Sequence, residues 1–345
     1  MRAAVLYKPL DLRIVDLPKP SPRPGEALVR VVVCGICRSD YHYWKHGRIG
    51  EFVVRKPLIH GHEASGVVEE VGEDVKELKR GDRVVIEPGV PCGECPYCRS
   101  GRYNLCPNVK FMATPPIDGA FAEYVAWDHR FIYKMPPGMS FEEGAMVDTT
   151  AIALHGLKRA GVPPGGTVVI IGPGPVGLCA LQCAQALGAG RIIMLGRGHG
   201  GKSSRMKVAK ELGAELVDVQ VEDPIKRVLE MTNGKGADLV VECSGADIAC
   251  SWTVDLVRKG GSIVLIGNYK KPISLPMFKV VFNEISIYGS RGNPNASDEA
   301  IGLIASGKVD VKKLITHVFS LDEFDKALET FVKRLDGAIK VIVKP

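Results

Sequence analysis

The sequence predicts an α/β protein in which a β-rich part precedes a doubly wound parallel sheet. In the first ~150 residues, short strand-like runs are separated by clusters of Gly and Pro. From Thr167 onward, apolar strand-like runs alternate with helix-like runs, which is typical of a parallel sheet with helices on both faces. The chain has 345 residues, of which 46% are hydrophobic and 24% charged, enough for two globular domains.

The individual elements follow from these patterns. In the first part we expect strands at Ala27–Val33, Ala64–Val71 and Arg83–Ile86. In the second part we expect strands at Val168–Ile171, Ile192–Leu195, Leu239–Glu242 and Ile263–Ile266. The helices expected between them are Val176–Leu187, Ser203–Leu212, Pro224–Thr232 and Ala249–Leu256. Near the end, a helix over Leu321–Arg334 leads to a strand over Ala338–Val343.

Charge and hydropathy exclude some classes of function. The net charge is +6, and the basic residues are scattered among acids, which argues against a nucleic-acid-binding surface. No apolar run is long enough to span a bilayer, so we expect no membrane partner. The first sixteen residues alternate like a strand and lack the apolar core of a signal peptide. We therefore expect a soluble cytoplasmic protein.

Four of the ten cysteines lie within fifteen residues, at Cys92, Cys95, Cys98 and Cys106. Gaps of two residues let one loop turn successive sulfurs toward a common point, and the longer gap lets the chain fold back to close a tetrahedron of thiolates. Four sulfurs leave no open position, so we predict a structural zinc. The alternatives are a redox or disulfide loop and an iron–sulfur site.

Potential ligands for a second metal are spread over three segments. The first segment is Cys34-Gly-Ile-Cys37-Arg-Ser-Asp-Tyr-His42, the second contains His62 and Glu63, and the third ends at Asp148. A cysteine, a histidine and a carboxylate from separate segments could form a site with one open position. Taken singly, each is more often a small core cysteine or a satisfied histidine.

A dinucleotide-binding motif follows the first strand of the second part. The strand Val168–Ile171 runs into Gly172-Pro-Gly174-Pro175-Val176-Gly177 and then into an apolar helix. In this pattern the glycines allow a tight turn, close approach to a pyrophosphate and close helix packing. The helix N-terminus then faces the phosphates. A bare G-x-G-x-x-G is weak, and the strand before it and helix after it strengthen it.

The next strand should end in an acid if the cofactor is NAD, because a carboxylate there binds the ribose 2′-hydroxyl. Here the strand ends in Gly196 followed by Arg197. The missing acid removes repulsion against a 2′-phosphate, and Arg197 could pair with it, assisted by Lys202, Ser203 and Arg205. We predict a preference for NADP over NAD; the alternative is that these are solvated loop charges.

Together these motifs resemble those of the medium-chain zinc-dependent alcohol dehydrogenases, and most of all the sorbitol/xylitol (polyol) dehydrogenase branch. The segments that carry the resemblance are Cys34–Gly50, Gly61–Gly66, Ile86–Gly89, Phe111–Pro116 and Phe141–Ala145. The resemblance implies a GroES-like catalytic domain at 1–149, with a structural-zinc lobe at about 88–110. It further implies a Rossmann domain at 150–290 and a return to the catalytic domain at 291–345.

The resemblance also implies the ligands of the catalytic zinc. Cys37 and His62 match the family's ligands. Glu63 matches a carboxylate that lies close to the metal, and Asp148 stands where polyol dehydrogenases carry Glu. Whether Glu63 or Asp148 ligates zinc directly or through water stays open.

Further roles follow from the same match. Ser39 corresponds to the hydroxyl that touches the substrate oxygen, His42 to the proton relay behind it, and Asp40 to the acid that orients the ligand histidine. Arg38 corresponds to an arginine that lies against the cofactor phosphates in other alcohol dehydrogenases. Positions near the substrate are matched by Tyr43, Phe111, Thr114 and Arg291.

The expected activity is zinc-dependent hydride transfer between a polyol or other secondary alcohol and NAD(P), giving a ketose or ketone. A dehydrogenase for simple secondary alcohols, threonine or glucose is the alternative within the superfamily. A catalytically silent nucleotide-binding protein is the alternative of another class. The family implies a homotetramer or a homodimer.

Overall fold

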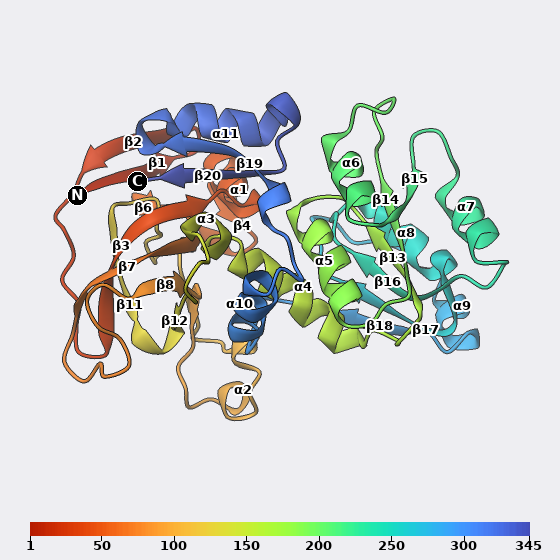
Figure 1. Cartoon of the computed structure of the whole chain (residues 1–345), viewed down its shortest axis with the longest axis horizontal. Helices are drawn as coiled ribbons and strands as arrows, with labels where there is room; N and C mark the ends of the chain where they lie inside the picture. The colour runs from red at the N-terminus through yellow and green to blue at the C-terminus, as the bar shows by residue number, and fades with distance from the viewer. The chain divides into compact units, whose positions relative to one another are not determined.

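The computed structural model describes all 345 residues and divides into two compact units. The first unit contains Met1–Asp148 and Ile315–Pro345, and the second contains Thr149–Leu314 (Figure 1). No helix reaches the length and apolarity that a membrane crossing requires. The predicted α/β fold class is confirmed.

The first unit is built from short strands. Its main sheet has the order β12-β8-β7-β3-β20-β19, with β11 also paired to β3. The strands of this unit are β1 Arg2–Lys8, β2 Asp11–Asp16, β3 Glu26–Gly35, β4 Arg48–Ile49, β5 Phe52–Val53, β6 Leu58–Ile59, β7 Glu63–Val71, β8 Arg83–Ile86, β9 Gly89–Val90, β10 Lys110–Phe111, β11 Tyr124–Asp128, β12 Ile132–Lys134, β19 Ile315–Ser320 and β20 Lys340–Lys344. Its helices are α1 Arg38–His46, α2 Pro96–Arg99, η1 Tyr103–Leu105, η2 His129–Phe131, α3 Phe141–Gly144, η4 Leu321–Glu323, α11 Phe324–Lys333 and η5 Leu335–Gly337.

The C-terminal segment completes this unit. Strand β20 pairs antiparallel with β3, through Val343 with Cys34, and α11 packs on β19 and β20 (Figure 1). The rings of Phe121 and Phe324 meet edge to face with centroids 4.9 Å apart in the buried core. The last residues of the chain therefore help to hold the strands that carry Cys34, Glu63 and their neighbours.

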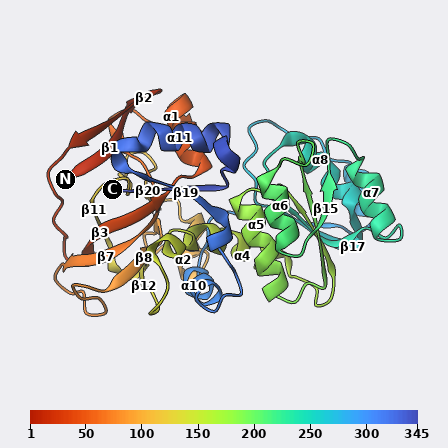
Figure 2. The ribbon, with the colours of Figure 1, turned by 45° about the horizontal axis from the view of Figure 1, so that its top comes forward.

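The second unit is a parallel sheet of six strands in the order β15-β14-β13-β16-β17-β18. Figure 2 shows α5 and α6 on one face of this sheet and α7 and α8 on the other. This is the doubly wound order in which the strand order reverses beside the first strand, here β13. Its elements are α4 Val147–Ala160, β13 Thr167–Ile171, α5 Pro175–Ala186, β14 Arg191–Gly196, α6 Ser204–Glu211, β15 Glu215–Asp218, α7 Pro224–Met231, β16 Ala237–Glu242, α8 Asp247–Leu256, β17 Val257–Leu265, α9 Met277–Phe282, β18 Ser286–Gly289, α10 Ser297–Ala305 and η3 Lys312–Leu314.

The return to the first unit comes later in the chain than the 291 expected from the sequence. Residues up to Leu314 remain with the second unit. The reason is visible in polar contacts: Lys158 of α4 pairs with Glu299 at 2.6 Å, and the Gln182 side chain of α5 accepts the Asp310 N–H at 2.6 Å. These contacts tie the α10 region to the helices of the second unit.

Candidate metal centres and cofactor motif

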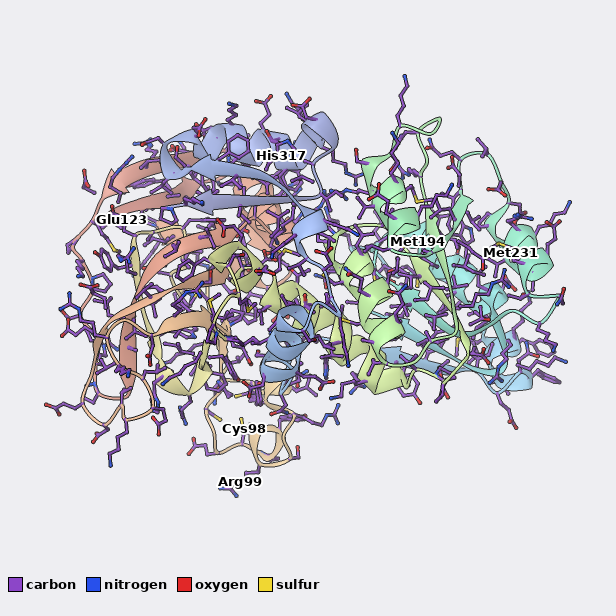
Figure 3. The ribbon with its side chains drawn as sticks, viewed as in Figure 1. Cys98, Arg99, Glu123, Met194, Met231 and His317 are labelled. Atoms are coloured by element: carbon purple, nitrogen blue, oxygen red, sulfur yellow. The ribbon has the colours of Figure 1, made fainter.

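The four-cysteine lobe brings its sulfurs together. Cys95 directly precedes α2, Cys106 directly follows η1, and the four Sγ atoms all lie within 4.8 Å of one another. The sulfurs of Cys95 and Cys98 are 3.3 Å apart, and all four cysteines are free thiols. Figure 3 labels Cys98 and Arg99 on this lobe. Four thiols at this spacing match the donor set of a closed tetrahedral zinc site.

The backbone of the lobe prepares one thiol for deprotonation. Backbone N–H groups of Glu94 and Cys95 point at the Cys92 sulfur and lower its pKa to about 7. A buried acid anchors the lobe to the strands behind it: Glu87 accepts the hydroxyl of Tyr103, in η1, at 2.6 Å and that of Tyr133, in β12, at 3.0 Å. The lobe is thus joined to the first unit by a carboxylate as well as by its chain ends.

A second cluster forms from Cys37, His62 and Glu63. Cys37 caps the N-terminus of α1, and Glu63 begins β7 directly after His62. One donor atom from each residue lies within 4.8 Å of the other two, and His62 and Glu63 are buried. Burial lowers the pKa of His62, but a hydrogen bond with the Cys37 side chain and the negative charges around it raise that pKa to about 10.

Asp40 holds this cluster in position from α1. One of its carboxylate oxygens accepts the Cys37 N–H at 2.8 Å, and the other accepts the Gly61 N–H at 3.2 Å. Its side chain is 3% exposed, so both bonds form away from solvent. Asp40 therefore joins the backbone before α1 to the backbone before His62.

Two further charged groups lie beside the cluster. Lys340 of β20 forms a buried ion pair with Glu63, although 277 residues separate them in the chain. Asp148, in the first turn of α4, is also buried, and its pKa rises to about 7, first through desolvation. Asp148 is not among the three groups whose donor atoms converge.

Of the predicted proton and substrate residues of the first unit, Phe111 contacts a member of this cluster, and the others have the following contacts. The Ser39 hydroxyl is buried and has no hydrogen-bond partner, and the His42 ring stacks on His46 at 6.1 Å. Phe111 lies against His62, with ring centroids 5.7 Å apart. Tyr43 shares a hydrogen bond with Thr114. A buried hydroxyl without a partner is a group that a polar ligand would satisfy.

The G-x-G-x-x-G motif of the second unit has the packing that the fingerprint requires. It connects β13 to α5, which begins at Pro175, and Val176 lies in the first turn. A Cβ on Gly177 would lie 2.0 Å from the Gly172 carbonyl oxygen, so the turn admits no side chain there. The Arg205 guanidinium lies 3.8 Å from where a Gly174 Cβ would be, which places a cation at the N-terminus of α5.

The end of β14 explains why no acid follows it. A Cβ on Gly196 would lie 2.6 Å from the Met206 sulfur and 2.7 Å from the Pro173 ring. Any side chain at this position therefore requires repacking of α6 or of the glycine-rich turn. The predicted arginines are exposed: Arg197 follows β14, Arg291 follows β18, and Arg38 lies over the Tyr41 ring at 5.1 Å.

Two residues beside the cluster of Cys37, His62 and Glu63 were missed in the sequence. Lys340 begins β20 between Ile339 and Val341, and a lysine in such an apolar run signals a buried charge that needs a partner. His60 is 1% exposed and lies between Asp40, 3.7 Å from its Nδ1, and the Tyr43 ring. Its place directly before Gly61-His62-Glu63 was the available signal.

Comparison with known proteins identifies the family. Residues 23–137 match the alcohol dehydrogenase GroES-like domain, and residues 175–306 match the zinc-binding dehydrogenase domain. The sorbitol dehydrogenase of Bacillus subtilis is 39% identical over 349 residues, which cover 100% of this chain and 97% of that protein. The chain belongs to the medium-chain zinc-dependent alcohol dehydrogenases. Human sorbitol dehydrogenase is 40% identical over 343 residues, covering 99% of this chain and 94% of its own.

A solved structure extends the likeness to the whole fold. A zinc-binding dehydrogenase from Sinorhizobium meliloti, solved bound to NADP, superposes with a TM-score of 0.92 at 30% identity. The match covers 100% of this chain and 99% of that one. The resemblance to the polyol branch of this family is confirmed, whereas the roles of individual site residues stay predictions.

Proposed function

We propose that this dehydrogenase oxidises a polyol, or reduces the corresponding ketose, with a catalytic zinc held by Cys37 and His62. The observation that carries the proposal is the convergence of Cys37, His62 and Glu63 within 4.8 Å, beside the buried and unpartnered Ser39 hydroxyl. A zinc ion in such a site polarises an alcohol oxygen and lowers its pKa. A nicotinamide cofactor bound at the glycine-rich turn would supply the hydride acceptor.

The protein groups around the cluster divide the remaining work. Asp40 orients the two ligand segments, as its bonds to Cys37 and Gly61 indicate. Ser39 would relay the proton that the alcohol releases by giving up its own hydroxyl proton, which would pass through the cofactor's ribose hydroxyl to His42 and solvent. Glu63, balanced by Lys340, and Asp148 supply the carboxylates near the metal.

The polyol assignment is supported by the sorbitol dehydrogenase relatives and by the Tyr43–Thr114 hydrogen bond, which brings together two hydroxyl groups on residues predicted to lie near the substrate. A polyol needs such additional partners, and a simple alcohol does not. The test is kcat/KM for sugar alcohols and cyclitols against propan-2-ol. Preference for propan-2-ol would replace the polyol with a simple secondary alcohol, and Tyr43→Phe should lower kcat/KM for polyols alone.

We further propose two zinc ions per chain, one in each cluster. Metal analysis of the purified protein should give two, and Cys37→Ala should retain one. The four thiols of the lobe support the structural ion because they complete a tetrahedron without water. A single zinc in the wild-type protein would contradict the proposal.

We propose that the cofactor is NADP. A ribose-binding acid at Gly196 would require repacking of Met206 and Pro173, while Arg197 directly follows Gly196 and Arg205 lies at the N-terminus of α5. The NADP-bound relative supports the same choice. Measured kcat/KM should favour NADP over NAD, and a preference for NAD would exclude it.

We propose that a second copy of the chain covers α9. Met277, Phe278, Val281 and Phe282 of this helix are 57–70% exposed, and the two phenylalanine rings stack at 4.0 Å. The helix leads directly into β18, which ends the six-stranded sheet and has an unpaired side. A two-fold pairing would cover both features at once, giving a homodimer or a homotetramer built from it.

Sedimentation tests this proposal. Val281→Glu should lower the mass of the assembly. Val221→Glu should leave that mass unchanged, because Val221 is 76% exposed and lies near β15, the strand at the other edge of the sheet. A wild-type monomer would refute it.

We propose that the protein lies in the cytoplasm, a location that the ten free thiols support.

A further inference from the structure

The strand beside β14 ends in an acid. Gly196, the last residue of β14, is the register partner of Asp218, the last residue of β15. The carboxylate that is missing at the end of one strand is therefore present on its immediate neighbour. Its contacts show what it does there.

Asp218 binds the loop that follows β14, which we call the 196–203 loop. Its Oδ1 accepts the N–H of Gly198 at 2.8 Å and the N–H of Gln220 at 3.1 Å. Gln220 in turn accepts the N–H of His199 at 2.8 Å through its side-chain oxygen. A Cβ on Gly198 would lie 2.0 Å from Asp218 Oδ2, so this approach requires glycine at position 198.

The loop holds one side-chain-bearing residue, His199, in a backbone conformation that disfavours side chains, whereas its glycines adopt the same region freely. His199, Gly200 and Gly201 have consecutive positive φ angles of 50°, 63° and 80°. They are exposed, so apolar packing contributes little to holding them. The bonds from Asp218 and Gln220 fix Gly198 and His199, and Arg197 lies directly between Gly196 and Gly198.

We propose that Asp218 and Gln220 are positioning residues that set cofactor preference by clamping the 196–203 loop. With the loop clamped, Arg197 is held at the place where a 2′-phosphate would bind. This inference rests on the proposed preference for NADP. Asp218 itself does not bind the ribose in this proposal. Its Oδ1 accepts hydrogen bonds from two backbone amides, and its Oδ2 faces Gly198.

The local charges agree with this role. A second acid, Glu222, accepts the Asp218 N–H at 3.2 Å and pairs with Arg227 at 3.2 Å. On the loop side the charged groups are Arg197, Lys202 and Arg205, all cations. The balance of charge around the 196–203 loop therefore favours an anionic substituent at the ribose 2′ position.

The test measures binding of adenosine 2′,5′-bisphosphate and of 5′-AMP to the full-length, zinc-replete protein by calorimetry. The ratio of the two dissociation constants reports preference without catalysis. Asp218→Ala removes the clamp and should lower the preference about tenfold, and Gln220→Ala, which changes no charge, about threefold. Asp218→Asn keeps an acceptor oxygen and should stay within about twofold of wild type.

Asp223→Ala is the matched control. Asp223 also accepts two backbone N–H groups, from Ile225 and Lys226, but it caps α7 and does not touch the loop. If Asp218 had a purely structural role, Asp218→Ala would weaken the binding of both ligands equally. The ratio of the two dissociation constants would then stay at the wild-type value, and this result would overturn the inference. Tighter binding of the bisphosphate together with weaker binding of 5′-AMP in Asp218→Ala would also overturn it, because Asp218 would then be a ribose-binding acid.

Failure of the cofactor proposal looks different. Wild-type protein that binds 5′-AMP more tightly than the bisphosphate contradicts the NADP preference, and the clamp with it. Wild-type protein that prefers the bisphosphate, with unmoved ratios in Asp218→Ala and Gln220→Ala, contradicts the clamp alone.

Discussion

The two metal clusters of the first unit are built in opposite ways. The proposed structural site of the lobe consists of four cysteines between Cys92 and Cys106, all of one type. The other cluster joins Cys37 to His62 and Glu63 and surrounds them with buried Asp40, Asp148 and Lys340. A closed thiolate site needs only a loop of suitable spacing, whereas a site with an open position needs a balanced set of buried charges.

The largest difference between the clusters should appear in activity. His62→Ala removes a ligand of the open site, and the loss of metal polarisation, worth several kcal/mol, should lower kcat/KM at least about a thousandfold. The variant should keep one zinc per chain. Steady-state kinetics with metal analysis on the same sample provide the measurement.

Cys98→Ser is the counterpart in the lobe. It should also leave one zinc per chain, lower the midpoint of thermal unfolding, and preserve kcat/KM within a fewfold in protein that stays folded. Equal loss of activity in the two variants would mean that the clusters do not divide structure from chemistry.

The next effect concerns the ion pair of Lys340 and Glu63, whose side chains are 1% and 4% exposed. In metal-free protein, Lys340→Met leaves a buried carboxylate without its partner and should lower the free energy of unfolding by about 3–5 kcal/mol. Denaturant unfolding measures the change. Added zinc should recover part of it, because a cation beside Glu63 replaces the lost charge.

Lys344→Met is the matched control on the same strand. Lys344 pairs with Glu142 at 2.9 Å, but the two side chains are 49% and 31% exposed. Removal of this pair should cost about 0–1 kcal/mol. Similar losses in the two variants would show that burial does not set the strength of the Lys340 pair.

The same contrast explains what could be predicted from the sequence. Strands such as Arg83–Ile86, the glycine-rich turn and the four-cysteine spacing are local patterns. Such patterns can be recognised in the sequence without knowledge of the fold. Lys340 and Glu63 are 277 residues apart in the chain. They meet only in the folded protein, so no local sequence pattern predicts their ion pair. Cys37 and His62 were predicted through a resemblance, because two residues 25 positions apart have no metal-binding geometry of their own.

The cofactor turn shows the same limit. The absence of an acid at Gly196 is visible in the sequence, but the reason for it, the contact of this position with Met206 and Pro173, is not. Asp218 lies twenty-two residues after Gly196 and meets it only because β14 and β15 are neighbours in register. Strand order, which sequence patterns leave open, decides which side chains share an edge.

Asp148 gives a smaller and pH-dependent effect. Its pKa in the folded state is about 7, above the 3.8 of an ordinary aspartate, because burial disfavours the charged form. The folded chain therefore keeps a proton that the unfolded chain loses. The stability contribution is full below about pH 4 and is lost as pH rises to about 7, by about 4 kcal/mol at most.

Asp148→Asn should abolish this loss in metal-free protein. The variant should match wild type near pH 4 and unfold at a higher temperature at pH 8, as measured by calorimetry. Asp325→Asn, at an exposed position of α11, is the control and should show no pH-dependent difference. A variant less stable than wild type at pH 8 would mean that Asp148 is held as a charged group.

The smallest effect tests how the lobe is attached. Glu87 accepts hydroxyls from Tyr103, within the lobe, and from Tyr133, in β12 behind it. Loss of one such bond to a charged acceptor should cost about 1.5–3 kcal/mol. The two phenylalanine variants should nevertheless differ, because only Tyr103→Phe frees a residue three positions from Cys106. It should speed release of one zinc to a chromophoric chelator, while Tyr133→Phe lowers stability and leaves that rate unchanged. If both variants release zinc at the wild-type rate, the four thiolates alone retain the metal, and Glu87 does not contribute to the closed geometry of the lobe.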